Sequence, residues 1–325
     1  MSEFNQSVTT VVHLILTGFL GFRSEESRRG LFGVVLTTYL FILLGNCILI
    51  LIFTSDRMLH TPMYVLICGL AVLDIAITAT IVPTVLAVFT FGQISVPFVP
   101  CVIQMIFHMG LFTTECFHLA LMAYDRYLAI CKPLYYPNLM YNTHALKLMA
   151  CCWVAGFFFA ASSVTLVLRF PFCGLNKIVN CFCDVFSLWL LACGDIILTG
   201  YILLFIGVTV TFIPLLYILF SYARITYSVL RIPSSKGRMK AFYTCGTHML
   251  VISVLFVIAI GVFISEKIPG TSIDICMMGL IIQNVLPPLM NPVIYCLRTK
   301  EIQNSFMKML KNFRILPFSV LEYKM

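Results

Sequence analysis

The chain has 325 residues, of which 61% are hydrophobic and only 10% are charged. A soluble globular domain carries about 25% charged residues, so this composition excludes that class and predicts a protein built within a lipid bilayer. The net charge of +8 is explained by membrane topology, and nothing in the sequence suggests nucleic-acid binding.

Seven apolar stretches are each long enough to cross a bilayer, which takes roughly 20 helical residues. In chain order they are Leu31–Phe53, Met63–Phe89, Val102–Leu121, Leu146–Leu168, Ile196–Phe220, Phe242–Ile264 and Ile275–Leu297. The sequence therefore predicts an all-α membrane protein, a seven-helix bundle at 31–297 within a single domain spanning 1–325. Residues 1–30 form a tail before the bundle. Residues 298–325 form a second tail, whose basic, amphipathic part predicts a short helix along the membrane interface.

The distribution of basic residues predicts which way the chain crosses the membrane. If the N-terminus lies outside, 15 of the 21 lysine and arginine residues fall on the cytoplasmic side or at cytoplasmic helix ends. Only the pair Arg28–Arg29 opposes this orientation as a cluster. No basic segment with a cleavage site precedes the first span, so we expect no cleaved signal peptide. The sequon that begins at Asn5 then lies outside, where it predicts glycosylation.

Four polar side chains on four predicted helices reach a similar depth in the bilayer. At 1.5 Å per residue, Glu115 lies about 16 Å from Arg126 along its helix, and Asp74 lies at a comparable depth. Asn46 and Asn291 approach the same level. Two carboxylates in hydrocarbon must find a cation, share a proton or be hydrated. We interpret the group as a sodium or proton pocket, with a hydrogen-bonded packing cluster as the alternative.

A second level of the bundle, nearer the predicted outer face, contains few polar groups. His108 lies about 27 Å from Arg126, and Phe256 and Asn284 also fall in the outer half. Their neighbours are mostly Met, Phe, Ile, Val and Ala, as is typical of a small-molecule cavity with a few polar groups. His108 either faces such a cavity or is a hydrogen-bonded structural histidine. No nucleophile–base pair or phosphate-binding loop indicates an enzyme.

An acid and a base, Asp125 and Arg126, stand side by side at the end of the third apolar stretch. Charges are expensive in hydrocarbon, so the pair either anchors the helix at the interface or belongs to a mechanism. Five of the 14 cysteines fall outside the bundle or at its outer helix ends: Cys101, Cys173, Cys181, Cys183 and Cys193. They can form disulfides in an oxidising compartment, and the odd number leaves one over.

Five stretches carry a resemblance that covers essentially the whole chain. They are LHTPMY at 59–64, MAYDRYLAIC at 122–131, SYARI at 221–225, KAFYTCGTH at 240–248 and PPLMNPVIY at 287–295. Together with the cysteine-rich segment after the fourth span, they make the chain resemble the rhodopsin-like G-protein-coupled receptors, and within them the odorant receptors. The resemblance implies a plasma-membrane protein of olfactory cilia that binds an odorant and activates a Gs/Golf-type G protein to raise cyclic AMP.

The resemblance also implies roles for individual residues. It implies the disulfides Cys101–Cys183 and Cys173–Cys193, with Cys181 left over. Asp74 and Glu115 match the acids of the family's ion pocket. The positions expected to rearrange on activation and to meet the G protein are Asp125, Arg126, Tyr127, Tyr222, His248 and Tyr295.

The ligand site implied by the resemblance lies between helices three, five, six and seven. Its candidate residues are His108, Met109, Phe112, Ile206, Val210, Phe256, Ile260, Phe263, Asn284 and Lys267. Phe256 replaces the tyrosine usual in the family, and His108 lies one place before the common histidine. Lys267 is either a partner for an acidic odorant or a solvated loop charge. The alternatives for the whole chain are a rhodopsin-like receptor for a lipid or hormone, and a transporter or channel.

Overall fold

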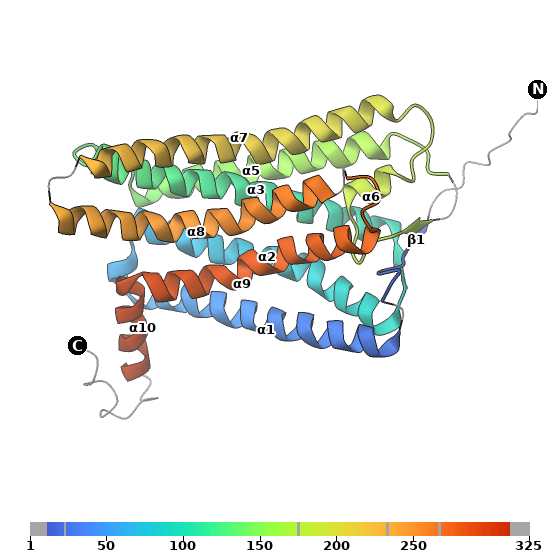
Figure 1. The fold of residues 1–325 in the computed structure, drawn as a ribbon, viewed down its shortest axis with the longest axis horizontal. Helices are drawn as coiled ribbons and strands as arrows, with labels where there is room; N and C mark the ends of the chain where they lie inside the picture. Colours follow the sequence, from blue (N-terminus) through green and yellow to red (C-terminus); the bar gives the residue numbers. More distant parts are fainter. Residues whose placement is uncertain (1–11, 23, 174–175, 232–233, 266–267, 313–325) are drawn as a thin grey trace, which may run out of the picture.

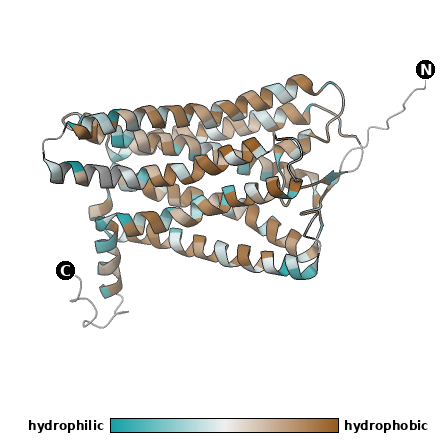
Figure 2. Cartoon of the chain, in the orientation of Figure 1, coloured by the Kyte–Doolittle hydropathy of each residue, from teal (hydrophilic) through white to brown (hydrophobic). Residues whose placement is uncertain are grey.

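Seven helices are long and apolar enough to cross a membrane in the part of the chain that the computed structural model describes, residues 12–22, 24–173, 176–231, 234–265 and 268–312. They run side by side as the predicted seven-helix bundle, and their residues are hydrophobic along most of their length (Figures 1 and 2). The seven are α1 (Glu25–Ser55), α2 (Pro62–Phe91), α3 (Phe98–Cys131), α5 (Asn142–Leu168), α7 (Ile197–Leu230), α8 (Ser235–Ser265) and α9 (Ile273–Arg298).

Shorter elements close the two ends of the bundle. One end has the strands β1 (His13–Leu16), β2 (Ile94–Pro97) and β3 (Lys177–Ile178) and the short helix α6 (Val185–Trp189), and we call it the strand end. The other end has η1 (Arg57–Leu59), α4 (Tyr136–Leu139) and α10 (Lys300–Asn312), and we call it the α10 end. Figure 1 shows α10 lying across the direction of the bundle helices. The short terminal helix expected from the sequence is therefore present.

The first helix begins at Glu25, six residues before the predicted apolar span. Ser24 has extended backbone angles, and its side chain accepts a hydrogen bond from the Ser27 amide at 3.2 Å. Glu25 and Glu26 follow in the first turn, where acidic groups favour the positive end of the helix dipole. These polar residues extend the helix beyond the apolar stretch. Hydropathy alone does not predict such an extension, because the added turns are not apolar.

The third helix also outruns its predicted span, continuing past Asp125 and Arg126 to Cys131. The two charges form an ion pair within the helix, so each neutralises the other and neither ends it. A side-chain hydrogen bond from Arg126 Nε to Asp125 Oδ2 measures 3.0 Å. The predicted end at Leu121 was therefore ten residues too early.

A three-stranded sheet at the strand end was not predicted. β1 lies in the middle, antiparallel to β2 and parallel to β3. Its side chains alternate, with Leu14 and Leu16 buried against the bundle. The sheet ties the N-terminal segment to two connections that lie far along the chain. Four residues are too few for the alternation to stand out in a sequence this apolar.

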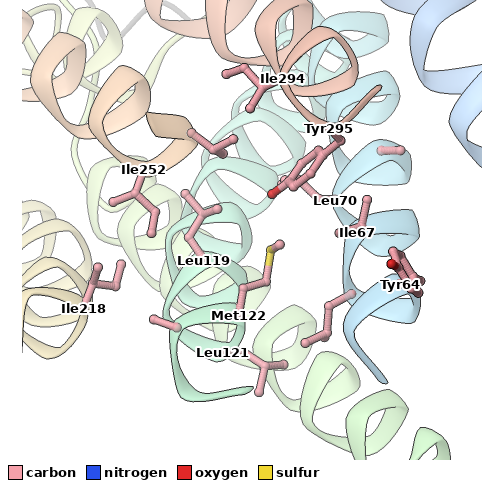
Figure 3. Close-up of a cluster of buried hydrophobic side chains, with 14 of the residues drawn as sticks. Tyr64, Ile67, Leu70, Leu119, Leu121, Met122, Ile218, Ile252, Ile294 and Tyr295 are labelled. Carbon is pink, nitrogen blue, oxygen red and sulfur yellow. The ribbon is translucent and has the colours of Figure 1, made fainter. Parts of the chain in front are cut away.

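The bundle is held by close helix contacts and two large buried clusters. A Cβ added to Gly156 of α5 would lie 2.2 Å from Thr114 Oγ1 and 2.7 Å from the Gly110 carbonyl oxygen, so α3 and α5 approach closely there. Figure 3 shows the cluster nearer the α10 end, where Tyr295 of α9 is directed toward Leu119 and Met122 of α3. The second cluster lies under the strands and includes the buried leucines of β1.

Candidate functional site

A cavity of about 700 Å³ opens within the bundle toward the strand end. Helices α3, α7 and α8 form most of its wall, α9 contributes Gln283, and α6 with the residue before it covers the cavity. From α7 the lining includes Gly200, Leu204, Gly207 and Thr211, which share one helical face. We call this space the main cavity.

Aliphatic and aromatic side chains make up most of the lining. Five candidates from the sequence line the main cavity: His108, Met109, Phe112, Ile260 and Phe263. Phe263 also meets Phe212 edge to face, with ring centroids 6.5 Å apart. Such a surface favours an apolar ligand, because burying its apolar area contributes about 25 cal/mol per Å².

Four other candidates do not line the cavity. Ile206 and Val210 lie on a neighbouring face of α7, and Val210 is buried between helices. Phe256 is buried in the cluster nearer the α10 end, below the cavity. Asn284 is buried behind His108. Counting residues along a helix predicts the depth of each candidate. It does not predict the direction in which the side chain points around the helix axis.

His108 is fixed on both sides. Its Nε2 lies 2.9 Å from Asn284 Oδ1, and the Asn284 amide group donates to the Leu280 carbonyl oxygen at 2.8 Å. The ring of Phe182 meets the imidazole edge to face at a centroid distance of 5.0 Å. Both predicted roles of His108 therefore apply, since it is hydrogen-bonded to α9 and also forms part of the cavity wall.

Two disulfides and one glutamine hold the connection above the cavity. The bonds join Cys101 to Cys183 and Cys173 to Cys193, the pairing that the resemblance implied. Gln104 of α3 donates to the Thr80 carbonyl oxygen and to Thr84 Oγ1, each at 2.8 Å, and accepts from the Cys183 amide at 2.9 Å. Sequence reasoning missed Gln104, although a glutamine inside an apolar helix is a signal that it has a partner.

The remaining outer cysteine, Cys181, is a buried thiol two residues before the disulfide-bonded Cys183. Burial, together with the charge of Asp274, raises the pKa of Cys181 to about 12. The thiolate is the reactive form of cysteine, so Cys181 stays protonated and unreactive at neutral pH.

Asp184 brings a carboxylate to the main cavity from the connection before α6. Its two oxygens accept hydrogen bonds from the Phe186 amide at 3.0 Å and from the Ser187 amide at 2.9 Å, which caps α6. Asp184 therefore serves the helix cap, and the cavity has no acid free of such contacts among its lining residues.

The four deep polar residues are only partly brought together. The Asn291 amide group donates to both Asp74 oxygens, at 3.1 and 3.0 Å, and Asn46 donates to the Pro288 carbonyl oxygen at 3.0 Å. The buried Asn46 Oδ1 has no hydrogen-bond partner among the described residues. Glu115 is 3% exposed, and no hydrogen bond joins it to Asp74 in the described part of the chain. A buried carbonyl oxygen without a donor, such as Asn46 Oδ1, is the kind of ligand that a hard cation takes.

At the α10 end, Asp125 is held from two directions. Besides its ion pair with Arg126, it accepts a hydrogen bond from the Tyr136 hydroxyl group of α4 at 2.8 Å. Burial, followed by the charge of Asp125, raises the pKa of Tyr136, so its hydroxyl stays a donor. Tyr136 was not among the predicted residues. Nothing in the sequence connects it to a residue eleven positions earlier.

The other predicted activation residues lie close to this pair. The rings of His248 and Tyr295 are tilted against each other with centroids 5.7 Å apart. Tyr222 is buried in the same cluster, and Tyr127 packs against it. The Tyr295 hydroxyl is buried without a hydrogen-bond partner among the described residues. The structure therefore gathers residues from α3, α7, α8 and α9 around Arg126.

Two predicted sites cannot be placed. Asn5 and Lys267 lie outside the described residues, so neither glycosylation nor a contact with an acidic ligand has a structural account.

Comparison with known proteins identifies close relatives over most of the chain. A family model described as olfactory receptor matches residues 35–313. Human olfactory receptor 10A2 is 40% identical over 280 residues, which cover 86% of this chain and 92% of that protein. Human olfactory receptor 10A3 is 37% identical over 310 residues, covering 95% and 97% respectively.

Proposed function

Because this chain belongs to the olfactory receptor family, a family of G-protein-coupled receptors and not of enzymes, we propose that it binds a small, mainly apolar odorant in the main cavity and activates a Gs/Golf-type G protein to raise cyclic AMP. The chain is a multi-pass plasma-membrane protein, and olfactory cilia are its proposed location. In this proposal the strand end faces outside and the α10 end faces the cytoplasm.

The observation that carries the proposal is the main cavity itself. Its volume of about 700 Å³ lies in the range of roughly 300–1,000 Å³ that small-molecule sites occupy. Its few polar groups include the imidazole of His108, whose orientation is already set by Asn284. A ligand with one hydrogen-bonding group and an apolar body satisfies both kinds of lining.

Coupling to the G protein would begin at the Asp125–Arg126 pair. Release of Arg126 from Asp125 frees a guanidinium group at the α10 end of the bundle. A ligand shifts such an equilibrium only by its difference in affinity for the two states. The odorant must therefore favour the bundle arrangement in which the α10 end is open to the G protein.

The deep acids would form a sodium pocket that stabilises the closed state. Asp74 and Glu115 supply carboxylate oxygens, while Asn46 and Asn291 supply amide groups beside them. We expect sodium chloride to raise the melting temperature of the purified receptor above that in choline chloride. Asp74→Asn combined with Glu115→Gln should abolish the difference, and a sodium effect that survives both changes would contradict the pocket.

The ligand proposal is tested by filling the cavity. A Cβ added to Gly207 meets nothing within 4 Å, so Gly207→Phe places a ring in the main cavity without a backbone clash. A panel of odorants is first screened with a cyclic AMP reporter. Gly207→Phe should then abolish the responses at unchanged surface expression.

The matched control is Gly261→Phe on α8, where a Cβ also meets nothing and the residue is exposed and does not line the cavity. It should respond as the unmodified receptor does. Equal responses from both variants and the unmodified receptor would show that the odorant binds elsewhere.

A further inference from the structure

A second cavity, of about 540 Å³, lies at the strand end. It is bounded by residues 17–22 after β1, the start of α1, the last turn of α2 with the residues that follow, and the β3 segment. It shares no lining residue with the main cavity. We call it the strand-end cavity.

The charged groups that line this cavity are both cations, Arg28 and Lys177. Arg28 makes one weak polar contact, from Nη1 to the Thr90 carbonyl oxygen at 3.5 Å, and its buried Nε has no hydrogen-bond partner among the described residues. Its neighbour Arg29 differs, because it forms an exposed ion pair with Glu25 at 2.5 Å. A half-buried guanidinium group that no carboxylate neutralises costs free energy, because its charge has lost part of its hydration without gaining a partner.

The backbone under Arg28 leaves room for the guanidinium group. Gly92 has φ +79°, and a Cβ there would lie 2.7 Å from Arg28 Nη1. The guanidinium group can lie against the chain only because this residue is glycine. The turn after α2 therefore provides the space in which the guanidinium group lies.

Most of the remaining wall is apolar, and four phenylalanines contribute to it. Phe19 stacks on Phe89 with centroids 5.9 Å apart and meets Phe22 edge to face at 5.6 Å. Phe91 stands at the rim with 71% of its surface exposed. A cationic group beside an aromatic wall is complementary to a molecule with an anionic head and an apolar body.

We propose that the strand-end cavity binds an amphiphilic carboxylate, a small organic anion with an aliphatic or aromatic body, separately from the odorant site. Arg28 and Lys177 hold the carboxylate, and the phenylalanine rings pack against the body. Arg28 belongs to the basic cluster that opposed the charge distribution expected from membrane topology, and the ligand gives it a role.

The probe is 4-phenylbutyrate, compared with the uncharged 4-phenylbutanol. Binding to the full-length receptor in phosphatidylcholine nanodiscs is titrated by saturation-transfer NMR. We expect saturable binding of the acid and at least about tenfold weaker binding of the alcohol, the loss expected for one charge-assisted contact. Binding of the acid should persist in Gly207→Phe, which separates this site from the main cavity and from the function proposed there.

Arg28→Gln should weaken binding of the acid at least about tenfold, whereas the matched control Arg29→Gln should leave it unchanged. Phe91→Glu places a negative charge at an exposed rim position, where folding is not at risk, and should weaken binding as well. Equal affinities for the acid and the alcohol, or equal effects of the two arginine variants, would overturn the proposal. It would also be overturned if phosphatidylglycerol in the nanodiscs blocked the site against the acid, since an anionic lipid would then be the occupant.

Discussion

The hydrogen bond from Tyr136 to Asp125 leads to a quantitative prediction about basal signalling. Tyr136→Phe removes only the hydroxyl group, which donates to Asp125 at 2.8 Å. A hydrogen bond to a charged group contributes about 1.5–3 kcal/mol, and the lower end applies because Tyr136 is half-buried. About 1.4 kcal/mol corresponds to a factor of ten in an equilibrium constant. If the bond exists only in the closed state, its loss raises the ratio of open to closed receptor roughly tenfold.

The assay is ligand-free cyclic AMP, normalised to the receptor at the cell surface. Tyr136→Phe should increase this basal signal, and Asp125→Asn should increase it as well because the ion pair with Arg126 is also lost. Arg126→Ala should suppress signalling. The control is Tyr135→Phe, since this neighbouring tyrosine is 64% exposed.

An unchanged basal signal in Tyr136→Phe, with Asp125→Asn elevated, would show that the ion pair alone holds the closed state. An unchanged signal in both variants would refute the reasoning, because Asp125 and Arg126 would then be anchors at the membrane interface and nothing more.

Three further predictions concern stability. A double-mutant cycle of His108→Ala and Asn284→Ala, read by thermal unfolding in detergent, should give a coupling of about 1 kcal/mol; additive effects would mean that their hydrogen bond contributes nothing. Gly156→Val should abolish the folded receptor in size-exclusion profiles, because its side chain has no room against α3, and a normal profile would contradict the close helix contact. The hydrogen bond from Ser305 lowers the pKa of Asp56 from 3.8, so Asp56 contributes stability above that pH and loses it as the pH falls through the folded value. The melting temperatures of the receptor and Asp56→Asn should therefore converge in acid, and a difference that grows on acidification would be inconsistent with this linkage.

The helices could be predicted from the sequence because hydrocarbon imposes a length and an apolar composition on every span. Depth along a helix was equally accessible. Residue counting placed His108 and Asn284 in the same outer half of the bundle. The structure joins them at 2.9 Å, a pairing that the sequence did not predict.

The direction of a side chain around its helix was harder to predict. α7 is apolar on all sides, so no pattern distinguished the face that contains Gly207 from the neighbouring face that contains Ile206 and Val210. Contacts between distant segments, such as that of Tyr136 with Asp125, depend on how the connections fold back, which hydropathy does not encode.

The sheet at the strand end has a consequence for the biosynthesis of the receptor. The side chain of Thr17 bonds to the carbonyl oxygen of Ile178, 161 positions later in the chain. At about 5–20 residues per second, the ribosome delivers β3 roughly 10–30 s after β1. During that interval Leu14 and Leu16 lack the surface that buries them in the finished fold. Damage to β1 should therefore reduce the yield of exported receptor more than it alters odorant affinity, because the strand is synthesised first and must wait for partners that follow much later in the chain.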